Sequence, residues 1–325
     1  GGGSNATSHG ANLAAGKAGY IVGAGNATNG EILDTISNSE GAVGSARNDY
    51  IALGAGGMSA TAGDGADVVV GGAGDDTIIG GAGADTLDGA GGTGDILSYS
   101  DITAASAAQH GIADADIIGV AVNVSGSALS GATINAAFSA TVFLGGGSNA
   151  SSHGSNLADG KVGYIVGAGN ASGGDVIDTV SNFESLVGSA RADFFALGSG
   201  GLTVDAGAGI DVIVNSGTGV DSLTGGAGND VFVYATSATF IGATSGADAA
   251  IDLIDGGDGA TDTIQITGVI GIGAGGTDTL ARVTNTEVLK AAANADGSNN
   301  YAHAVTLASD AAMGSIRTLD FSADV

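Results

Sequence analysis

The strongest constraint on this chain is a nine-residue repeat in which glycines lead to an aspartate and a short apolar or β-branched run follows. The first array consists of AGDGADVVV (62–70), GGAGDDTII (71–79), GGAGADTLD (80–88) and the irregular GAGGTGDILS (89–98). The second array consists of AGAGIDVIV (206–214), SGTGVDSLT (216–224) and GGAGNDVFV (225–233), and a relaxed copy, GGDGATDTIQ, follows at 256–265. Units of this kind bury their apolar face only against their neighbours, so the repeat indicates a solenoid.

Each unit predicts a turn followed by a short strand. Six glycine-rich residues are poor helix formers, because glycine costs about 1 kcal/mol per helical position, and they suit a turn that needs positive φ. The next three residues can form a strand whose middle side chain points inward. Two units make one coil of 18 residues, and successive coils stack as parallel strands about 4.8 Å apart. The predicted fold is all-β, a parallel β-roll or β-helix solenoid, with inward residues Val69, Ile78, Leu87, Leu97, Ile213, Leu223, Phe232 and Ile264.

In such a roll, aspartates two units apart lie above one another on one edge. Asp67 is expected between Asp49 and Asp85, and Asp76 is expected to pair with Asp95. Stacked carboxylates repel each other unless a cation lies between them. Calcium takes six to eight oxygen ligands, whereas zinc or copper prefers histidine or cysteine, which the arrays lack. Two alternatives remain at this point: a solvated acidic surface, or columns of aspartate that stack without metal.

The units GGAGDDTII, GGAGADTLD and GGAGNDVFV resemble the RTX, or hemolysin-type, calcium-binding nonapeptide. The resemblance implies a β-roll in which turn carbonyls and the sixth-position aspartate bind several calcium ions. The metal-ligating aspartates that it implies are Asp67, Asp76, Asp85, Asp95, Asp211, Asp221, Asp230 and Asp262. The turn glycines that accompany them are Gly63, Gly65, Gly71, Gly74, Gly80, Gly83, Gly225 and Gly228. The coils centred on Met58 and Leu202 have no aspartate and are expected to be free of metal.

A longer duplication organises the chain. Residues 1–53 are repeated at 145–197 without a gap, and most positions are identical. A solenoid can be lengthened by whole blocks of sequence, so this duplication also indicates a solenoid. We expect a first solenoid block with its array at 62–98, a connecting section, a second block with arrays at 206–233 and 256–265, and further coils. The first block comprises residues 1–98, the connecting section 99–144, the second block 145–265 and the further coils 266–325. We also expect the chain to be a segment of a longer repetitive protein.

Charge and motifs exclude several classes of function. The chain has 34 acidic and 7 basic residues and a net charge of −27, so we expect no nucleic-acid partner, which would need clustered lysine and arginine. No run approaches the roughly 18 apolar residues of a membrane span, so we expect no membrane insertion. The chain has no cysteine and therefore no disulfide or thiol chemistry. It lacks the HExxH and GxSxG motifs, and we expect that it is not an enzyme.

The resemblance to RTX proteins also implies a place and a role. It implies export in unfolded form by a type I system and folding in the millimolar calcium outside the cell, hence an extracellular or bacterial cell-surface location. We expect a calcium-dependent structural protein, a subunit of an S-layer, sheath or filament, that associates with itself and has cell-surface polysaccharide as a further candidate partner. The alternatives are the spacer region of a large RTX adhesin that mediates surface or biofilm attachment, and a calcium-binding accessory domain of a secreted hydrolase.

Overall fold

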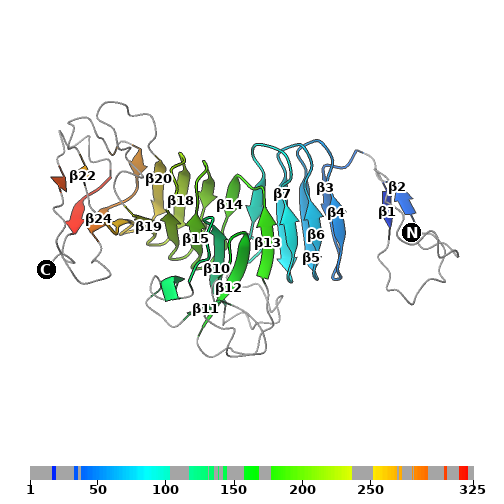
Figure 1. Cartoon of the computed structure of the whole chain (residues 1–325), viewed down its shortest axis with the longest axis horizontal. Coiled ribbons are helices and arrows are strands. Elements are labelled where there is room, and N and C mark those ends of the chain that lie inside the picture. Colours follow the sequence, from blue (N-terminus) through cyan, green and yellow to red (C-terminus); the bar gives the residue numbers. More distant parts are fainter. Residues whose placement is uncertain are drawn as a thin grey trace.

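The computed structural model of the chain describes residues 17–19, 33–35, 38–102, 117–130, 132–134, 138, 142–144, 157–167, 177–235, 252–268, 271–272, 280, 282–291, 304–305 and 315–320. These residues form an elongated roll of two long sheets (Figure 1). Strands dominate, and the described α-helix is limited to residues 132–134. Among the described residues, no helix has the length and the apolar character of a membrane span. The predicted all-β class is confirmed.

The sheet that we call the long sheet has 13 strands, and the one that we call the short sheet has nine. The long sheet runs in the order β26 (Thr318–Asp320), β24 (Val288–Ala291), β21 (Thr263–Ile266), β19 (Val231–Tyr234), β17 (Val212–Asn215), β15 (Phe194–Leu197), β10 (Ile117–Val124), β12 (Lys161–Gly167), β13 (Ile177–Ser181), β8 (Thr86–Asp88), β6 (Val68–Val70) and β4 (Tyr50–Ala52), with β11 (Val142–Leu144) beside β12. The short sheet runs in the order β23 (Val283–Thr284), β20 (Leu253–Asp258), β18 (Ser222–Ala227), β16 (Thr203–Asp205), β14 (Ser185–Val187), β9 (Ile96–Ser98), β7 (Thr77–Ala82), β5 (Ser59–Asp64) and β3 (Gly41–Val43). Two small sheets pair β1 (Lys17–Gly19) with β2 (Leu33–Thr35) and β22 (Gly271–Ile272) with β25 (Ala304–Val305).

The register of the strands confirms the predicted parallel roll. In the first array Ser59 of β5 lies opposite Thr77 of β7, and Val68 of β6 lies opposite Thr86 of β8, so each pair is two nine-residue units apart. The next coil is one residue longer because the turn before Ile96 is irregular, and Ile96 therefore lies opposite Thr77. Within the two arrays the chain alternates between the two sheets, and every second unit returns to the same sheet.

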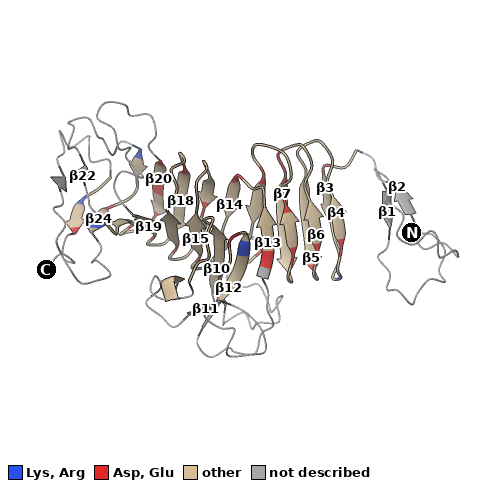
Figure 2. Ribbon diagram, in the orientation of Figure 1, with Lys and Arg blue, Asp and Glu red and all other residues tan. Residues whose placement is uncertain are grey.

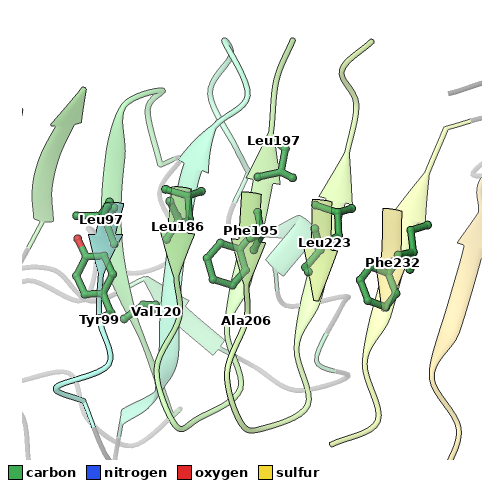
Figure 3. Close-up of a cluster of buried hydrophobic side chains, with 14 of the residues drawn as sticks. Leu97, Tyr99, Val120, Leu186, Phe195, Leu197, Ala206, Leu223 and Phe232 are labelled. Atoms are coloured by element: carbon green, nitrogen blue, oxygen red, sulfur yellow. The ribbon is translucent and has the colours of Figure 1, made fainter. Parts of the chain in front are cut away.

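The core lies between the two sheets and is as narrow as the repeat predicts. All eight predicted inward residues are at most 1% exposed, and they join residues of both sheets in one cluster. Figure 3 shows the side chains of Leu97, Leu186, Leu223 and Phe232 following one another along the roll. Burial of each such side chain contributes about 1.5–3 kcal/mol, so the stability of the roll grows with the number of coils.

The second copy of the duplicated block stacks directly on the first array. In the short sheet Ser185 of β14 lies opposite Ile96 of β9, and in the long sheet Thr179 of β13 lies opposite Thr86 of β8. The section between these points supplies β10 and the antiparallel strand β12, which enter the long sheet between β13 and β15. The two blocks are therefore one continuous roll with an insertion.

Candidate metal centre

The aspartates of the first array stack as the repeat predicts. Each one directly precedes a strand and turns its carboxylate toward the preceding coil. Oδ1 of Asp67 accepts the N–H of Asp49 at 2.6 Å, and Oδ1 of Asp85 accepts the N–H of Asp67 at 2.8 Å. On the other edge of the roll, Oδ1 of Asp95 accepts the N–H of Asp76 at 2.7 Å. The predicted stacking of Asp67 on Asp85 and of Asp76 on Asp95 is confirmed.

The second array repeats this arrangement. Oδ1 of Asp211, Asp230 and Asp262 accepts the N–H of the aspartate one coil earlier, at 2.7, 2.8 and 2.8 Å respectively. Oδ1 of Asp221 accepts the N–H of Leu202 at 2.7 Å. All eight aspartates that the sequence singles out are at most 1% exposed. A backbone N–H of the coil before it therefore holds each of these four carboxylates.

Five of these carboxylates have a second oxygen that is buried and has no hydrogen-bond partner. They belong to Asp67, Asp85, Asp211, Asp230 and Asp262. These five residues directly precede strands of the long sheet, at the turns that lead there from the short sheet, and we call this side of the roll the open edge. An ionised carboxylate oxygen buried without a partner is costly, so each of these groups needs a proton or a cation.

The opposite side of the roll, where turns lead from the long sheet to the short sheet, is called the closed edge. Here the protein supplies its own donors to Asp76, Asp221 and Asp252. Oδ2 of Asp76 accepts the N–H of Gly72 at 2.6 Å, and Oδ2 of Asp221 accepts Nδ2 of Asn215 at 2.7 Å. Asp252 is satisfied on both oxygens, by the N–H of Asp221 on Oδ1 and by the Tyr234 hydroxyl on Oδ2.

The conformation of the turn explains the difference between the edges. In the open turn before Asp85, Gly81 has a φ of +86°, which only glycine adopts freely. Gly72 holds the same position in the closed turn before Asp76 but has no positive φ, and it turns its N–H to the carboxylate. Gly63, Gly207, Gly226 and Gly257 share the positive φ of Gly81, and each precedes another of the five aspartates.

The open turns also bring backbone carbonyls close to these carboxylates. A Cβ added at Gly259 would lie 2.1 Å from the carbonyl oxygen of Gly228 and 2.6 Å from both carboxylate oxygens of Asp262. A Cβ added at Gly83 would lie 1.4 Å from the carbonyl oxygen of Gly65. The glycines therefore keep clear a space that is lined by oxygen atoms.

The donor set fits calcium. Carboxylate and carbonyl oxygens are the ligands of a hard cation, whereas zinc sites are built from histidine and cysteine. In the described part of the chain no group of three or more His, Cys, Asp or Glu side chains converges on one point. A cation at the open edge would therefore take most of its ligands from the backbone, as the resemblance to the RTX repeat implies.

The predicted turn glycines divide between the two edges. Gly63, Gly65, Gly83 and Gly228 have positive φ and belong to open turns. Gly80 and Gly225 begin open turns, and a Cβ at either would lie within 2.7 Å of the following aspartate Oδ2. Gly71 and Gly74 belong to the closed turn before Asp76. The prediction missed Gly81 and Gly226, although the doubled glycine of the motif marks both.

Several acidic residues that lack the motif extend the stacks. Asp178 accepts the N–H of Asp85 on Oδ1 and the Tyr99 hydroxyl on Oδ2, both at 2.8 Å. Glu184 accepts the N–H of Asp95, and Glu287 accepts that of Asp262, both at 3.0 Å. No local pattern identifies Asp178 as a neighbour of Asp85, because the insertion separates the two residues in sequence. Glu184 lies nine residues before Asp193, and this spacing is the feature of the sequence that identifies it as a member of the stack.

Burial raises the pKa of the open-edge carboxyls. It raises the pKa of Asp85 to about 7, that of Asp230 to about 6 and that of Asp211 to about 9. The neighbouring Asp193 carboxylate raises the pKa of Asp211 further. The pKa values of Asp67 and Asp262 are also raised, chiefly by burial. Without a cation, these groups tend to hold a proton.

We expect the free energy of unfolding in a chelator to fall as the pH rises from about 4 to about 9. Each of these carboxyls has a folded pKa above its ordinary value of 3.8, so its protonation stabilises the roll at low pH. This stabilisation is lost as the pH rises through the folded pKa, with a slope of up to about 1.4 kcal/mol per pH unit for one group. Urea unfolding in a chelator at several pH values between 5 and 9 measures the slope.

The control for this prediction is Asp211→Asn, which keeps the acceptor Oδ1 but has no proton to lose. Its slope is expected to be smaller than that of the wild type, most clearly toward pH 9. A wild-type stability that rises with pH in the chelator would contradict the assignment of raised pKa values to these carboxyls.

Comparison with known proteins agrees with this geometry. The family model for the RTX calcium-binding nonapeptide repeat, in four copies, matches residues 61–96 and 205–235. No curated protein matches the chain. The matched ranges contain the second array, all but the last two residues of the first array, and four of the five aspartates with an unpaired oxygen. Asp262 continues the stack beyond them.

Proposed function

We propose, from the premise that this chain is an RTX-type calcium-binding repeat protein, that it is a structural protein outside the bacterial cell. In this proposal it is a subunit of an S-layer, sheath or filament that folds and assembles when calcium binds. The observation that carries the proposal is the series of five buried carboxylate oxygens without partners on one edge of a continuous roll. A roll of this kind is rigid only when those charges are neutralised.

The calcium ions are assigned to the open edge. Asp67, Asp85, Asp211, Asp230 and Asp262 would supply carboxylate oxygens there, and the turn glycines would supply carbonyl oxygens. On the closed edge, Asp76 and Asp221 already accept protein donors on both oxygens and would have to give them up to bind a metal. When bound, calcium neutralises the stacked carboxylates and links the turns of adjacent coils.

The mechanism is folding coupled to binding. The net charge of −27 and the high glycine content both oppose a compact state, through charge repulsion and backbone entropy. Figure 2 shows few Lys and Arg positions beside the Asp and Glu positions along the ribbon of the roll. Extracellular calcium modules have dissociation constants of about 10⁻⁴–10⁻³ M, so millimolar calcium outside the cell is sufficient to fold the arrays.

A structural role is also supported by the chemistry of the surface. The hollow between Val124, Phe183 and Leu202 is lined by apolar and small polar residues, and none of its lining side chains is an acid, a base or a cysteine. The buried aspartates belong to the stacks that connect adjacent coils. The part of the chain that the structure describes thus carries its buried acidic groups in positions suited to holding coils together.

Negative-stain microscopy of the full chain in millimolar calcium and in chelator tests the proposal. We expect ordered sheets or fibres in calcium that dissolve when the chelator is added. Folded monomers that persist at high protein concentration in calcium would contradict assembly. Such monomers would favour the spacer region of an adhesin, in which the roll separates binding parts that lie elsewhere.

A further inference from the structure

Each array ends in a turn that the nine-residue repeat does not describe. The last turn of the first array, residues 89–95, and that of the relaxed copy, residues 256–262, are one residue longer than the turns of the regular units. The second residue of each has positive φ, +69° at Ala90 and +93° at Gly257. Ala90 thus adopts, without being a glycine, the conformation that accompanies an unpaired carboxylate oxygen elsewhere in the roll. The two end turns have the same build, although they lie on opposite edges.

A short turn of the form Asn-x-Glu stacks on each end turn. The two short turns are Asn182-Phe183-Glu184 and Asn285-Thr286-Glu287. Both asparagines have positive φ, +57° and +47°. Nδ2 of Asn182 donates to Oδ1 of Asp88 at 2.7 Å, and Nδ2 of Asn285 donates to Oδ1 of Asp255 at 2.8 Å. These aspartates directly precede the end turns, so each short turn is fixed against its end turn in the same way. The short turns contain no glycine and lie outside the nonapeptide repeat.

The glutamate of each short turn takes the place of the next aspartate in the stack. In the regular part of the stack, Oδ1 of Asp262 accepts the N–H of Asp230 at 2.8 Å. At the ends, Oε2 of Glu287 accepts the N–H of Asp262, and Oε2 of Glu184 accepts that of Asp95, both at 3.0 Å. Burial raises the pKa of Asp262, and repulsion by the Glu287 carboxylate raises it further. The two carboxylates are therefore close enough to share a cation.

The asparagine supplies a carbonyl oxygen where the repeat has that of a glycine. A Cβ added at Gly225 would lie 2.6 Å from the carbonyl oxygen of Gly256 and closer still to Oδ2 of Asp230. A Cβ added at Gly256 would lie 2.8 Å from Oδ2 of Asp262 and closer still to the carbonyl oxygen of Asn285. The last turn of the stack therefore keeps the pair of oxygens that the regular open turn has.

The end of the first array has the same arrangement of oxygens. A Cβ added at Gly89 would lie 3.0 Å from Oδ2 of Asp95 and closer still to the carbonyl oxygen of Asn182. Asp95 is 1% exposed, its Oδ1 accepts the N–H of Asp76, and none of the described residues donates a hydrogen bond to its Oδ2. Asp262 is 0% exposed, and its Oδ2 is buried without a partner. Each end thus directs an unpaired oxygen of a buried aspartate into a space lined by carbonyl and carboxylate oxygens.

We propose that each array ends in a calcium site of its own, in which the glutamate of the Asn-x-Glu turn replaces the next aspartate of the repeat. At the end of the second array the ligands would be Asp262, the Glu287 carboxylate and the Asn285 carbonyl oxygen. Their counterparts at the end of the first array are Asp95, Glu184 and Asn182. Carboxylate and carbonyl oxygens are the ligands that calcium prefers, and its charge would offset the repulsion between the two carboxylates. The inference rests on the proposed calcium-dependent folding and adds two glutamates and one closed-edge site to it.

Counting bound calcium in glutamine variants tests these sites. Glu184→Gln and Glu287→Gln keep an oxygen that can accept the aspartate N–H but remove the charge. Equilibrium dialysis of the full chain against millimolar calcium is expected to find one ion fewer per chain in each variant than in the wild type, and two fewer in the double variant. The matched control is Glu40→Gln, in a third Asn-x-Glu sequence, where Glu40 is exposed and accepts the N–H of no described aspartate. The control is expected to bind as many ions as the wild type.

Stability in urea separates a calcium ligand from a residue that only holds the turn. In a chelator, Glu287→Gln is expected to unfold at a higher urea concentration than the wild type, because it removes a carboxylate that repels Asp262. In millimolar calcium it is expected to unfold at a lower concentration, because one bound ion is lost. A midpoint that falls by the same amount in both conditions would assign Glu287 to the bond with the Asp262 N–H alone and would overturn the site.

The outcomes separate the terminal sites from calcium binding in general. If both glutamine variants bind as many ions as the wild type, the terminal sites are wrong and the sites of the repeat stand. If only one variant loses an ion, the site at the other end is wrong, and the shared build does not by itself make a site. If the wild type binds no calcium in the millimolar range, the proposed calcium-dependent function fails together with these sites.

Discussion

Removal of calcium is expected to abolish most of the β-structure of both arrays. In a chelator at pH 8, the open-edge carboxylates face one another without a cation, and at that pH Asp85 and Asp230 have lost the proton that would replace it. A titration with calcium, followed by circular dichroism, is expected to restore the β signal cooperatively in the millimolar range. A flat response to millimolar calcium would contradict the assignment of the open edge as a calcium site.

The expected effect is comparable to the whole stability of a domain. A site with a dissociation constant of about 10⁻⁴ M adds about 1.4 kcal/mol at 1 mM free calcium, so several such sites add about 5 kcal/mol or more. A typical domain is stable by about 5–15 kcal/mol, and the loss of this contribution is sufficient to unfold glycine-rich arrays.

Two variants nine residues apart distinguish the edges. Asp85→Asn keeps the Oδ1 acceptor but removes an open-edge charge, so we expect it to reduce the calcium-dependent gain in stability by about 1.4 kcal/mol or more while raising stability in the chelator. Asp76→Asn removes a charge-assisted bond to Gly72 and is expected to lower stability by about 1 kcal/mol with and without calcium. Equal losses of calcium response in both variants would show that both edges bind the metal.

Gly228→Ala is expected to destabilise the second array by about 3 kcal/mol or more, even at saturating calcium. Gly228 has a φ of +147°, and an added Cβ would lie 1.4 Å from the carbonyl oxygen of Gly209. The methyl group would therefore force adjacent turns apart at the place where their carbonyls converge. Urea unfolding of the variant and the wild type in millimolar calcium measures the loss.

The matched control is Gly56→Ala, which changes the same position of a repeat unit at the first end of the roll. A Cβ at Gly56 would meet nothing within 4 Å, and Gly56 has no positive φ. Its expected effect is within about 0.5 kcal/mol of the wild type, as for ordinary surface substitutions. If both variants lost the same amount of stability, the loss would reflect glycine replacement in general and not the close approach of the turns.

The repeat period alone was sufficient to predict the coil, the inward residues and the stacking of the aspartates. These features depend on neighbours one or two units away in sequence, such as Val69 beside Leu87 or Asp67 beside Asp85. A connecting section was predicted at 99–144, but the pairing of β8 with β13 across it was not, because it joins residues that no local pattern relates. Asp178 and its bond to Tyr99 were missed for the same reason.

The sequence by itself determined the class of this protein, because glycine, aspartate and an apolar residue at a nine-residue period leave a chain few ways to bury its surface other than a roll. Only the tertiary structure separated the two edges. Asp76 and Asp85 occupy the same position of nearly identical units, yet Gly72 donates to one carboxylate, whereas the positive φ of Gly81 accompanies an unpaired oxygen on the other. That choice depends on the conformation of each turn, and this conformation is defined only when the coils have stacked.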